Sequence, residues 1–573
     1  MRIPCITNSS DNYLFWEDSV LRNKPQTDGA PAVKNSTKLF FSGVLVLTIS
    51  NLIIKAIGLL FKIPMNHIVG DTGMGYYSHA YTLYTCFFMI ATNGLPVALA
   101  MMLSESRSKG QIRQAKRVFR IALLLFVVVG FVGMCIMMIG AQAYSEHVLK
   151  ADATVYCILA TAPTLFFISI SSAFRGYFQG YQQMLPTAIS QLIEALCKLF
   201  LGILLATYAL RQGYEIHIVA AYAAVGLTIG AALGMIFLSF YKLLFKEARY
   251  NAEFVDQSGE SDYIESARTI LKRIAVIAIP ITISSSVMSI TNLFDAVLVE
   301  RILQAIGMTE EAATTVYGNY TSLAVPMFNM PPYLIYPISY SIIPILTMAR
   351  GSGDQARANR IMESALRVAV LIGLPCALGM SAMSKPILSL FYVQESVEMA
   401  WSLLSLLAPS TFFVCMLSVT NAILQANGHE RKPLYSMLAG AAVKIVSNYF
   451  LLYAVGMHGT PISTFLCYLT ATAMNLYFVA KHVGVMPKIG RVFVKPLAAS
   501  VLCAASAVGA YALLTGPLSM SGRLPTLLSI VVAVGVYVIL IFLLRAITPD
   551  DIRLLPKGNK ILSILKRVRL VRE

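Results

Sequence analysis

Two lysines lie in the middle of long apolar stretches of this sequence, where a charge is costly. Lys55 stands deep in the first stretch, and Lys62 follows seven residues later. Seven residues are close to two helical turns, so both side chains point to nearly the same face of a helix. Lys55 has no acidic neighbour in the sequence, and we therefore expect it to line a water-filled cavity.

A later apolar stretch carries a second set of charges. Asp295 stands inside it, and Glu300 and Arg301 follow at its end. Lysine and arginine are the side chains that bind phosphate groups, so a cavity with cations on both stretches would suit a pyrophosphate. Lys62 and Arg301 are also consistent with side chains that only reach the membrane interface at a helix end. Our candidate binding residues are Lys55, Lys62, Asp295 and Arg301.

Glu194 and Lys198 are one helical turn apart, with the acid first, which favours an ion pair within one helix. Lys444 ends an A-x-x-K segment like the one that Lys198 ends. Either lysine could instead extend to the nearer interface. The seven histidines are dispersed and the nine cysteines show no metal-binding spacing. We therefore expect no enzyme, no catalytic residue, no metal site and no cofactor.

The composition indicates the elements that must position these charges. The chain of 573 residues is 57% hydrophobic and only 13% charged, whereas soluble proteins are about 45–50% apolar and about 25% charged. Repeated apolar runs of helix-spanning length predict an all-α, polytopic membrane protein. We predict fourteen transmembrane helices, at 39–64, 76–103, 118–142, 153–178, 187–208, 217–243, 270–298, 315–346, 364–384, 397–425, 433–455, 459–480, 493–515 and 525–546.

The distribution of basic residues predicts the orientation of these spans. With a cytoplasmic N-terminus, the cytoplasmic loops and tails contain 36 of the 45 Lys and Arg residues, and the opposite side contains six. Such an excess marks cytoplasmic loops, so we expect a multi-pass protein of the cell membrane with both termini inside. The net charge of +17 is explained in this way, without a nucleic-acid partner.

An internal repeat appears at an offset of about 247 residues. Gly180 and Pro186 frame one short loop, and Gly428 and Pro433 frame its counterpart. Pro96 and Pro344 are likewise 248 residues apart. Spans 1–6 and 7–12 are therefore predicted to form two pseudo-symmetric six-helix lobes, related by an axis along the membrane normal. Two C-terminal helices lie outside the repeat.

These observations define the expected domains. They are a disordered cytoplasmic tail (1–37), an N-lobe (38–246), a cytoplasmic linker (247–267), a C-lobe (268–482), helices 13 and 14 (483–550) and a basic cytoplasmic tail (551–573). Prolines and glycines interrupt spans two and eight, as in Gly94-Leu95-Pro96. Such breaks either kink a helix or allow it to bend during transport.

Several segments resemble the stage V sporulation protein B group, within the superfamily of lipid II flippases, O-antigen flippases and multidrug exporters. The resemblance covers roughly residues 38–550. The segments that carry it are I-V-G-D-T-G-M-G-Y-Y (Ile68–Tyr77), G-L-P-V-A-L-A-M-M-L-S-E (Gly94–Glu105), F-R-G-Y-F-Q-G-Y-Q-Q-M-L-P-T-A-I-S-Q-L-I-E (Phe174–Glu194), N-M-P (Asn329–Pro331) with Pro344, and Gln425 to Lys444.

This resemblance implies two lobes that form a V around a central cavity, with two further helices that build a groove for a lipid tail. It implies alternating-access translocation of a polyprenyl-pyrophosphate-linked precursor, lipid II or a related oligosaccharide lipid, in peptidoglycan, polysaccharide or spore cortex synthesis. Lipid II flippases of the best-known type line the cavity with arginines, whereas this chain offers Lys55, Lys62 and Arg301. Implied partners are the lipid-linked oligosaccharide, membrane lipids and cell-wall synthesis enzymes, with a monomeric protein.

Two other functions are compatible with the same lobes. A cation-coupled multidrug exporter would need carboxylates in the cavity, and Asp295 and Glu194 are the deep candidates. A non-transporting membrane scaffold for cell-wall synthesis would tolerate loss of the cavity charges.

Overall fold

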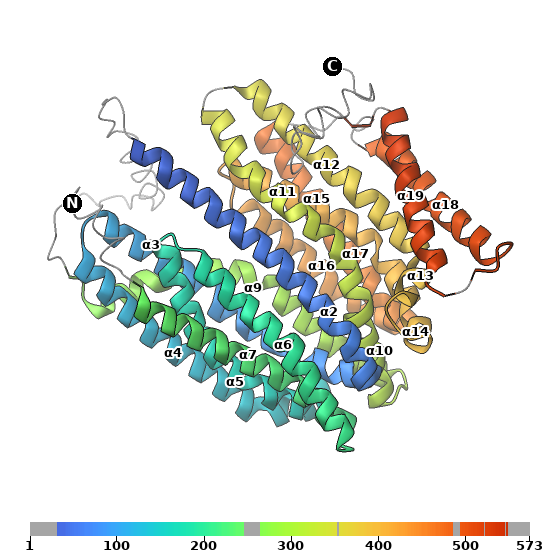
Figure 1. The fold of residues 1–573 in the computed structure, drawn as a ribbon, viewed down its shortest axis with the longest axis horizontal. Helices are drawn as coiled ribbons and strands as arrows, with labels where there is room; N and C mark the ends of the chain where they lie inside the picture. Colours follow the sequence, from blue (N-terminus) through green and yellow to red (C-terminus); the bar gives the residue numbers. More distant parts are fainter. Residues whose placement is uncertain are drawn as a thin grey trace, which may run out of the picture.

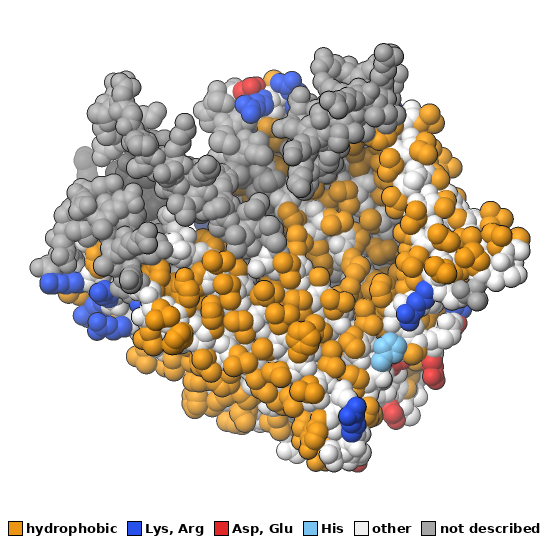
Figure 2. All heavy atoms as spheres, viewed as in Figure 1, with side chains coloured by type: hydrophobic (Ala, Val, Ile, Leu, Met, Phe, Trp, Pro, Cys, Tyr) orange, Lys and Arg blue, Asp and Glu red, His pale blue; other side chains and the backbone are white. Residues whose placement is uncertain are grey.

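The computed structural model describes residues 31–245, 264–351, 354–484, 493–520, 522–544 and 546–547, and over these residues the chain is helical and contains no strand (Figure 1). Large apolar side chains cover the outside of the helices, as the orange surface in Figure 2 shows. Ile139 is 83% exposed and Phe200 65% exposed. A surface of this kind is stable against lipid, and helices satisfy their backbone polar groups there.

The first helix, α2 (Pro31–Met89), is folded into two arms at Gly70. Gly70 has φ 66° and ψ −177°, a conformation that side chains with a Cβ rarely adopt. The first arm therefore runs from Pro31 to Gly70, and the second arm runs back. We call the end of the molecule at Gly70 the distal end, and the opposite end, where α2 begins, the proximal end.

The second arm of α2 belongs to the N-lobe. Within this lobe α5 packs against α3, α4 and α7, and α6 packs against α7 and α2. The remaining N-lobe helices are the π-helical turn η1 (Ile90–Gly94), α3 (Leu95–Ser108), α4 (Ile112–Ala143), η2 (Tyr144–Leu149), α5 (Thr154–Gly180), α6 (Leu185–Arg211) and α7 (Ile216–Leu244).

The C-lobe is built around α15, which packs against α11, α12 and α17. Its helices are α9 (Ala267–Ala305), α10 (Glu310–Asn319), η3 (Tyr320–Ala324), α11 (Val325–Gly351), α12 (Gln355–Ala382), α13 (Ser384–Ser389), α14 (Gln394–Leu407), α15 (Pro409–Ala426), α16 (Lys432–Val455), η4 (Gly456–His458), α17 (Gly459–Phe478) and η5 (Val479–Val483). The two groups of helices converge at the distal end, near α10, and run apart toward the proximal end (Figure 1).

Two further helices, α18 (Lys495–Thr515) and α19 (Leu524–Leu543), pack on one another and against α12. The Tyr537 hydroxyl donates to the backbone oxygen of Leu371 at 2.6 Å. The pair therefore sits on the outside of the C-lobe, which agrees with the predicted addition of two C-terminal helices to two lobes.

Both lobes contain the same local irregularity. A five-residue π-helical turn precedes Leu95-Pro96 in the N-lobe, and another precedes Val325-Pro326 in the C-lobe. A proline removes a backbone donor and crowds the preceding turn, which favours such a bulge. The match of Pro96 with Pro344 in the repeat stays a prediction.

Every predicted span coincides with one helix or with consecutive helices of the structure. By length and apolar composition, ten helices of the described residues could cross a membrane, or eleven with the bent pair Ala267–Ile283 and Ser285–Ala305. Of the ten, Lys432–Val483 contains two predicted spans, and Ser50–Ser108 contains one and the larger part of another. The count of fourteen stays a prediction.

Several of the predicted domain boundaries fall outside the residues that the structure describes. Residues 1–30, 246–263 and 548–573 lie outside them, and with them most of the two tails and the linker. Helix α2 begins at Pro31, so seven residues of the predicted tail, 31–37, are helical.

Candidate functional site

Lys55 and Lys62 lie on the face of α2 that meets the C-lobe. The Lys62 ammonium donates to the backbone oxygen of Thr321 at 2.6 Å. The Lys55 ammonium lies 5.8 Å from the centroid of the Tyr333 ring in α11. Lys55 and Lys62 therefore share one face of α2, as their spacing predicted. This face points toward η3 and α11 of the C-lobe.

A third lysine, Lys198 of α6, joins these two. Its ammonium lies 4.4 Å from the ring centroid of Tyr81, 4.9 Å from that of Phe61 and 5.6 Å from that of Tyr77. Phe61 directly precedes Lys62 in α2, so Lys198 lies against the same arm of α2 that carries Lys55 and Lys62. We call Lys55, Lys62 and Lys198 the lysine cluster. No carboxylate of the described residues forms an ion pair with any of the three.

The predicted ion pair between Glu194 and Lys198 is wrong. Glu194 pairs instead with Arg175 of α5, whose guanidinium also donates to the Ser190 hydroxyl at 3.2 Å. Arginine presents several donors in a planar fork, so it can satisfy the carboxylate and the hydroxyl together. Lys198 therefore contacts aromatic rings instead of Glu194. Its match with Lys444 in the repeat was the sequence signal for its importance.

Asp295 lies inside the C-lobe, away from the lysine cluster. It forms an ion pair with Lys444 of α16 and accepts a hydrogen bond from the Asn448 amide at 3.0 Å. All three residues are buried, with exposed fractions of 6%, 3% and 0%. A charge buried among helices needs such a partner, so Asp295 and Lys444 neutralise one another and join α9 to α16.

Arg301 lies at the distal rim and is exposed. Its guanidinium donates to the backbone oxygen of His147 and, at 2.7 Å, to that of Val148. These two residues follow α4 in the N-lobe. Arg301 thus joins the lobes at their distal end, and the structure does not bring it to Lys55 or Lys62.

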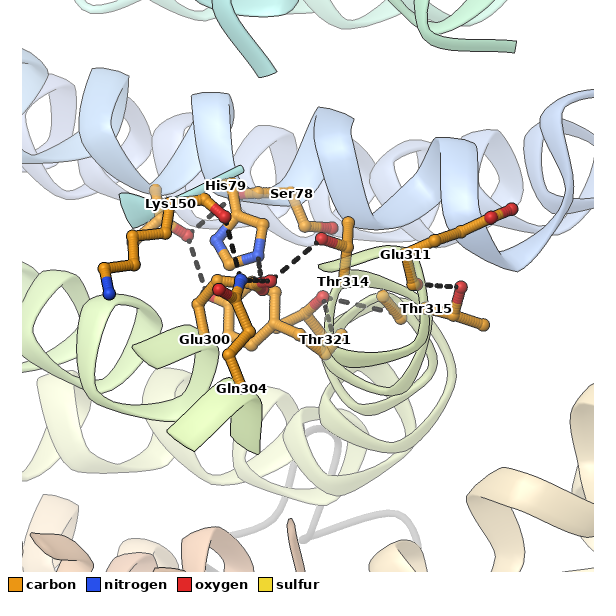
Figure 3. Close-up of polar contacts among 12 residues, drawn as sticks. Ser78, His79, Lys150, Glu300, Gln304, Glu311, Thr314, Thr315 and Thr321 are labelled. Carbon is orange, nitrogen blue, oxygen red and sulfur yellow. Dashed lines mark hydrogen bonds and ion pairs between the residues drawn. The ribbon is translucent and has the colours of Figure 1, made fainter. Parts of the chain in front are cut away.

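A buried polar network lies next to Arg301 (Figure 3). His79 reaches from the second arm of α2 to Glu300 on α9, with 3.0 Å between Nε2 and Oε2, and both side chains are 0% exposed. The other carboxylate oxygen accepts hydrogen bonds from Gln304 at 3.0 Å and Thr314 at 3.1 Å. The His79 ring stacks on Tyr317 with 4.0 Å between centroids. Sequence reasoning missed this pair, because its members are 221 residues apart.

Further contacts extend this junction along α2 and α10. A Cβ on Gly75 would collide with the backbone oxygen of Thr314, and one on Gly318 would collide with that of Asp71, so the glycines permit close approach of the two helices. Hydrogen bonds between the lobes at this end are Thr72–Thr315 at 2.8 Å, Ser78–Ser322 at 3.3 Å, Thr82–Tyr317 at 3.3 Å, Ser396–Asp71 at 2.7 Å and Gln304 to the Lys150 backbone at 2.8 Å.

We call this junction the distal clasp, comprising His79, Glu300, Arg301 and the hydrogen bonds just given. It joins the lobes beyond Lys62, and the lysine cluster lies on the proximal side of it along α2. The lysine cluster therefore places positive charge between two lobes that the distal clasp joins at one end. Such a site can bind an anionic group and can change its access by release of the clasp.

Comparison with known proteins places this geometry in context. The chain is 26% identical over 470 residues to the lipid II flippase MurJ of Bacillus subtilis (strain 168), covering 79% of this chain and 85% of that protein. It is 23% identical to stage V sporulation protein B of the same organism, covering 90% and 98%.

The fold matches solved structures. The structure of lipid II flippase MurJ in an inward closed conformation superimposes with a TM-score of 0.66 at 14% identity, covering 87% of this chain and 98% of that one. An inward-facing multidrug resistance MATE family transporter matches with a TM-score of 0.56 at 15% identity, covering 76% and 98%.

Two family models match the sequence. A model described as MatE matches residues 280–450, within the C-lobe. The model described as polysaccharide biosynthesis protein matches residues 40–350, more than half of the chain. The chain therefore belongs to the polysaccharide biosynthesis protein family.

Proposed function

We propose that this protein is a flippase that moves a polyprenyl-pyrophosphate-linked cell-wall precursor, lipid II or a related oligosaccharide lipid, across the cell membrane by alternating access. The observation that carries the proposal is the lysine cluster. The Lys55 and Lys62 ammonium groups face the C-lobe from α2, and the Lys198 ammonium lies against Phe61 of the same arm, on the proximal side of the distal clasp. The likeness to lipid II flippases supports it, because those proteins move a substrate of this class.

The charges of the cluster suit a pyrophosphate. In a low-dielectric region such a group needs cations close by, and ammonium groups bind phosphate as compact point charges. The rings of Phe61, Tyr77 and Tyr81 hold the Lys198 ammonium in place without neutralising it. Lys55 is exposed and so accessible to a ligand between the lobes. Lys55, Lys62 and Lys198 are our proposed substrate-binding residues.

The two other candidate residues take different roles in this proposal. Arg301 stabilises the state in which the distal clasp is closed, through its contacts with the 147–148 backbone. Asp295 holds the C-lobe together through Lys444. By the distribution of basic residues the proximal end is cytoplasmic and the clasp is external, so the present conformation would accept substrate from the cytoplasm.

A multidrug exporter is the competing function, given the MATE-like fold. Export of cationic drugs needs carboxylates free to meet the substrate. The two deep carboxylates, Asp295 and Glu194, are each paired with a cation of the protein. The charge of the site therefore favours an anionic substrate.

Reconstitution tests the proposal. Proteoliposomes with fluorescent lipid II should show protein-dependent flipping, which Lys55→Ala and Lys198→Ala should abolish and Lys55→Arg should retain. Lys385→Ala is the matched control, because Lys385 is half exposed at the distal end and pairs with Glu398 at 2.6 Å. Full flipping by both alanine variants would contradict the proposed site. Efflux of a cationic dye without lipid II flipping would favour the exporter.

A further inference from the structure

Two accessible tyrosine rings lie beside the lysine cluster, one from each lobe. Tyr81, on the second arm of α2, is 37% exposed, and its ring centroid lies 4.4 Å from the Lys198 ammonium. Tyr333, on α11, is half-buried, and its ring centroid lies 5.8 Å from the Lys55 ammonium. Each ring therefore offers an apolar surface directly next to a positive charge.

Other aromatic side chains hold these two rings in place. Tyr81 stacks on Tyr77 with 5.9 Å between centroids, and it lies 5.8 Å from Tyr84. Tyr77 and Tyr84 are 3% and 4% exposed, so they form a fixed support for the accessible ring. In the C-lobe, the rings of Tyr333 and Tyr336 are 6.1 Å apart. Rings that are ordered before a ligand arrives lower the entropy cost of binding.

The lysine-bearing face of α2 leaves space for a ligand. Gly58 follows Lys55 by three residues and precedes Lys62 by four, so it lies on nearly the same side of the helix. A Cβ placed on Gly58 would have no atom within 4 Å. The helix surface between the two lysines is therefore uncovered, which leaves room beside the ammonium groups for more than a pyrophosphate.

A ligand that contacts these rings must meet two requirements. Toward the face of a ring, which carries negative partial charge, it must present C–H groups. It also displaces water from an ammonium group, so it must supply oxygen acceptors in place of that water. A polyprenyl chain meets only the first requirement and a pyrophosphate only the second. A pyranose meets both, because it has C–H groups on its face and hydroxyl groups around its edge.

We propose that Tyr81 and Tyr333 bind the saccharide of the substrate, with a C–H face of a sugar on each ring and sugar hydroxyls toward Lys198 and Lys55. This inference rests on the proposed function and extends it, because it assigns the sugar, and not only the pyrophosphate, to particular side chains. One ring belongs to each lobe, so the saccharide contacts both lobes at once.

Binding of two lipids to the purified full-length protein in detergent tests the proposal. One is undecaprenyl pyrophosphate with a disaccharide attached, and the other carries a methyl group in place of the disaccharide, so both have the same charge. The wild-type protein should bind the glycosylated lipid more tightly. Tyr81→Leu and Tyr333→Leu should each reduce this preference about three- to ten-fold, the range of one aromatic contact, without changing the affinity for the methyl-capped lipid.

Three further variants separate the ring contact from other effects. Tyr81→Phe keeps the ring and should keep the preference. Lys198→Ala should weaken binding of both lipids alike, because both contain the pyrophosphate. Tyr208→Leu is the matched control: Tyr208 is 54% exposed, and it lies ten residues beyond Lys198, about 15 Å along α6 toward the distal end. It should leave both affinities unchanged.

The outcomes distinguish this inference from the proposed function. If the wild-type protein binds neither lipid, the proposed function itself fails. If it binds both lipids equally, or if the preference survives in both leucine variants, the flippase stands and the saccharide site falls. An equal loss of both lipids in the leucine variants would show that the rings serve only the lysines. Loss of the preference in Tyr81→Phe would assign it to the hydroxyl and refute stacking on the ring.

Discussion

Substitution of His79 by phenylalanine isolates the buried hydrogen bond that joins the two lobes. Glu300 has three donors, but Gln304 and Thr314 belong to its own lobe, and only His79 belongs to the other. Phenylalanine keeps a planar ring against Tyr317 and removes the donor. The change therefore acts on the state with a closed clasp and spares the contacts within the C-lobe.

The expected effect follows from the burial of the pair. A hydrogen bond to a charged group contributes about 1.5–3 kcal/mol, and the carboxylate of Glu300 cannot turn to water because it is 0% exposed. When the lobes separate at the distal end, water can donate to Glu300 in place of His79. The substitution therefore costs the distally open state little free energy. The population ratio should therefore move toward the distally open state by roughly 10- to 150-fold.

Distance measurements between the lobes provide the assay. Spin labels at Gln212, after α6, and at Glu395, in the first turn of α14, are exposed at the distal ends of opposite lobes. Double electron–electron resonance on the reconstituted protein should show a longer distance gaining population in His79→Phe. Thr314→Val is the control, because it removes a donor to the same carboxylate that comes from the C-lobe itself and keeps the branched side chain that packs near Gly75. It should lower thermal stability and leave the distances unchanged. An unaltered distribution in His79→Phe, or an equal shift in Thr314→Val, would refute the role assigned to this bond.

The remaining predictions concern the site, the fold and one acid. Asp295→Asn should destabilise the protein by about 3–5 kcal/mol, because it leaves Lys444 buried without its countercharge; thermal unfolding in detergent measures this, and Asp295→Asn with Lys444→Met should recover much of the loss. Truncation after residue 488 removes α18 and α19, and should leave a folded two-lobed protein by gel filtration that no longer flips lipid II; flipping by the truncated protein would argue against a role in holding the lipid tail. Burial, and then the charge of Asp152, raises the pKa of Glu310, so the folded state binds this proton more tightly and stability should fall as pH rises above about 4.5. Glu310→Gln should flatten that part of the melting-temperature profile, and an unchanged profile would count against this carboxyl as its source.

The sequence by itself determined the class of the protein and much of its local structure. Long apolar runs predict helices whatever their neighbours are, because each satisfies its own backbone polar groups. The spacing of Lys55 and Lys62 placed both side chains on one face, since helical geometry alone relates residues seven apart. The segment Ile68–Tyr77, which contains Gly75, and the other segments that resemble flippases are likewise short stretches of sequence. The match to the polysaccharide biosynthesis protein family agrees with that resemblance.

Only the tertiary structure decided which charges meet. Glu194 had Lys198 one turn away, yet its partner is Arg175 of another helix, because the packing of α5 against α6 brings a better donor into reach. His79 looked like one dispersed histidine among several until the fold set it against Glu300. Helix spacing governs contacts within a helix, whereas contacts between helices depend on crossing angle, rotation and register. Those are set by the packing of many side chains at once, and no short segment of the sequence contains them.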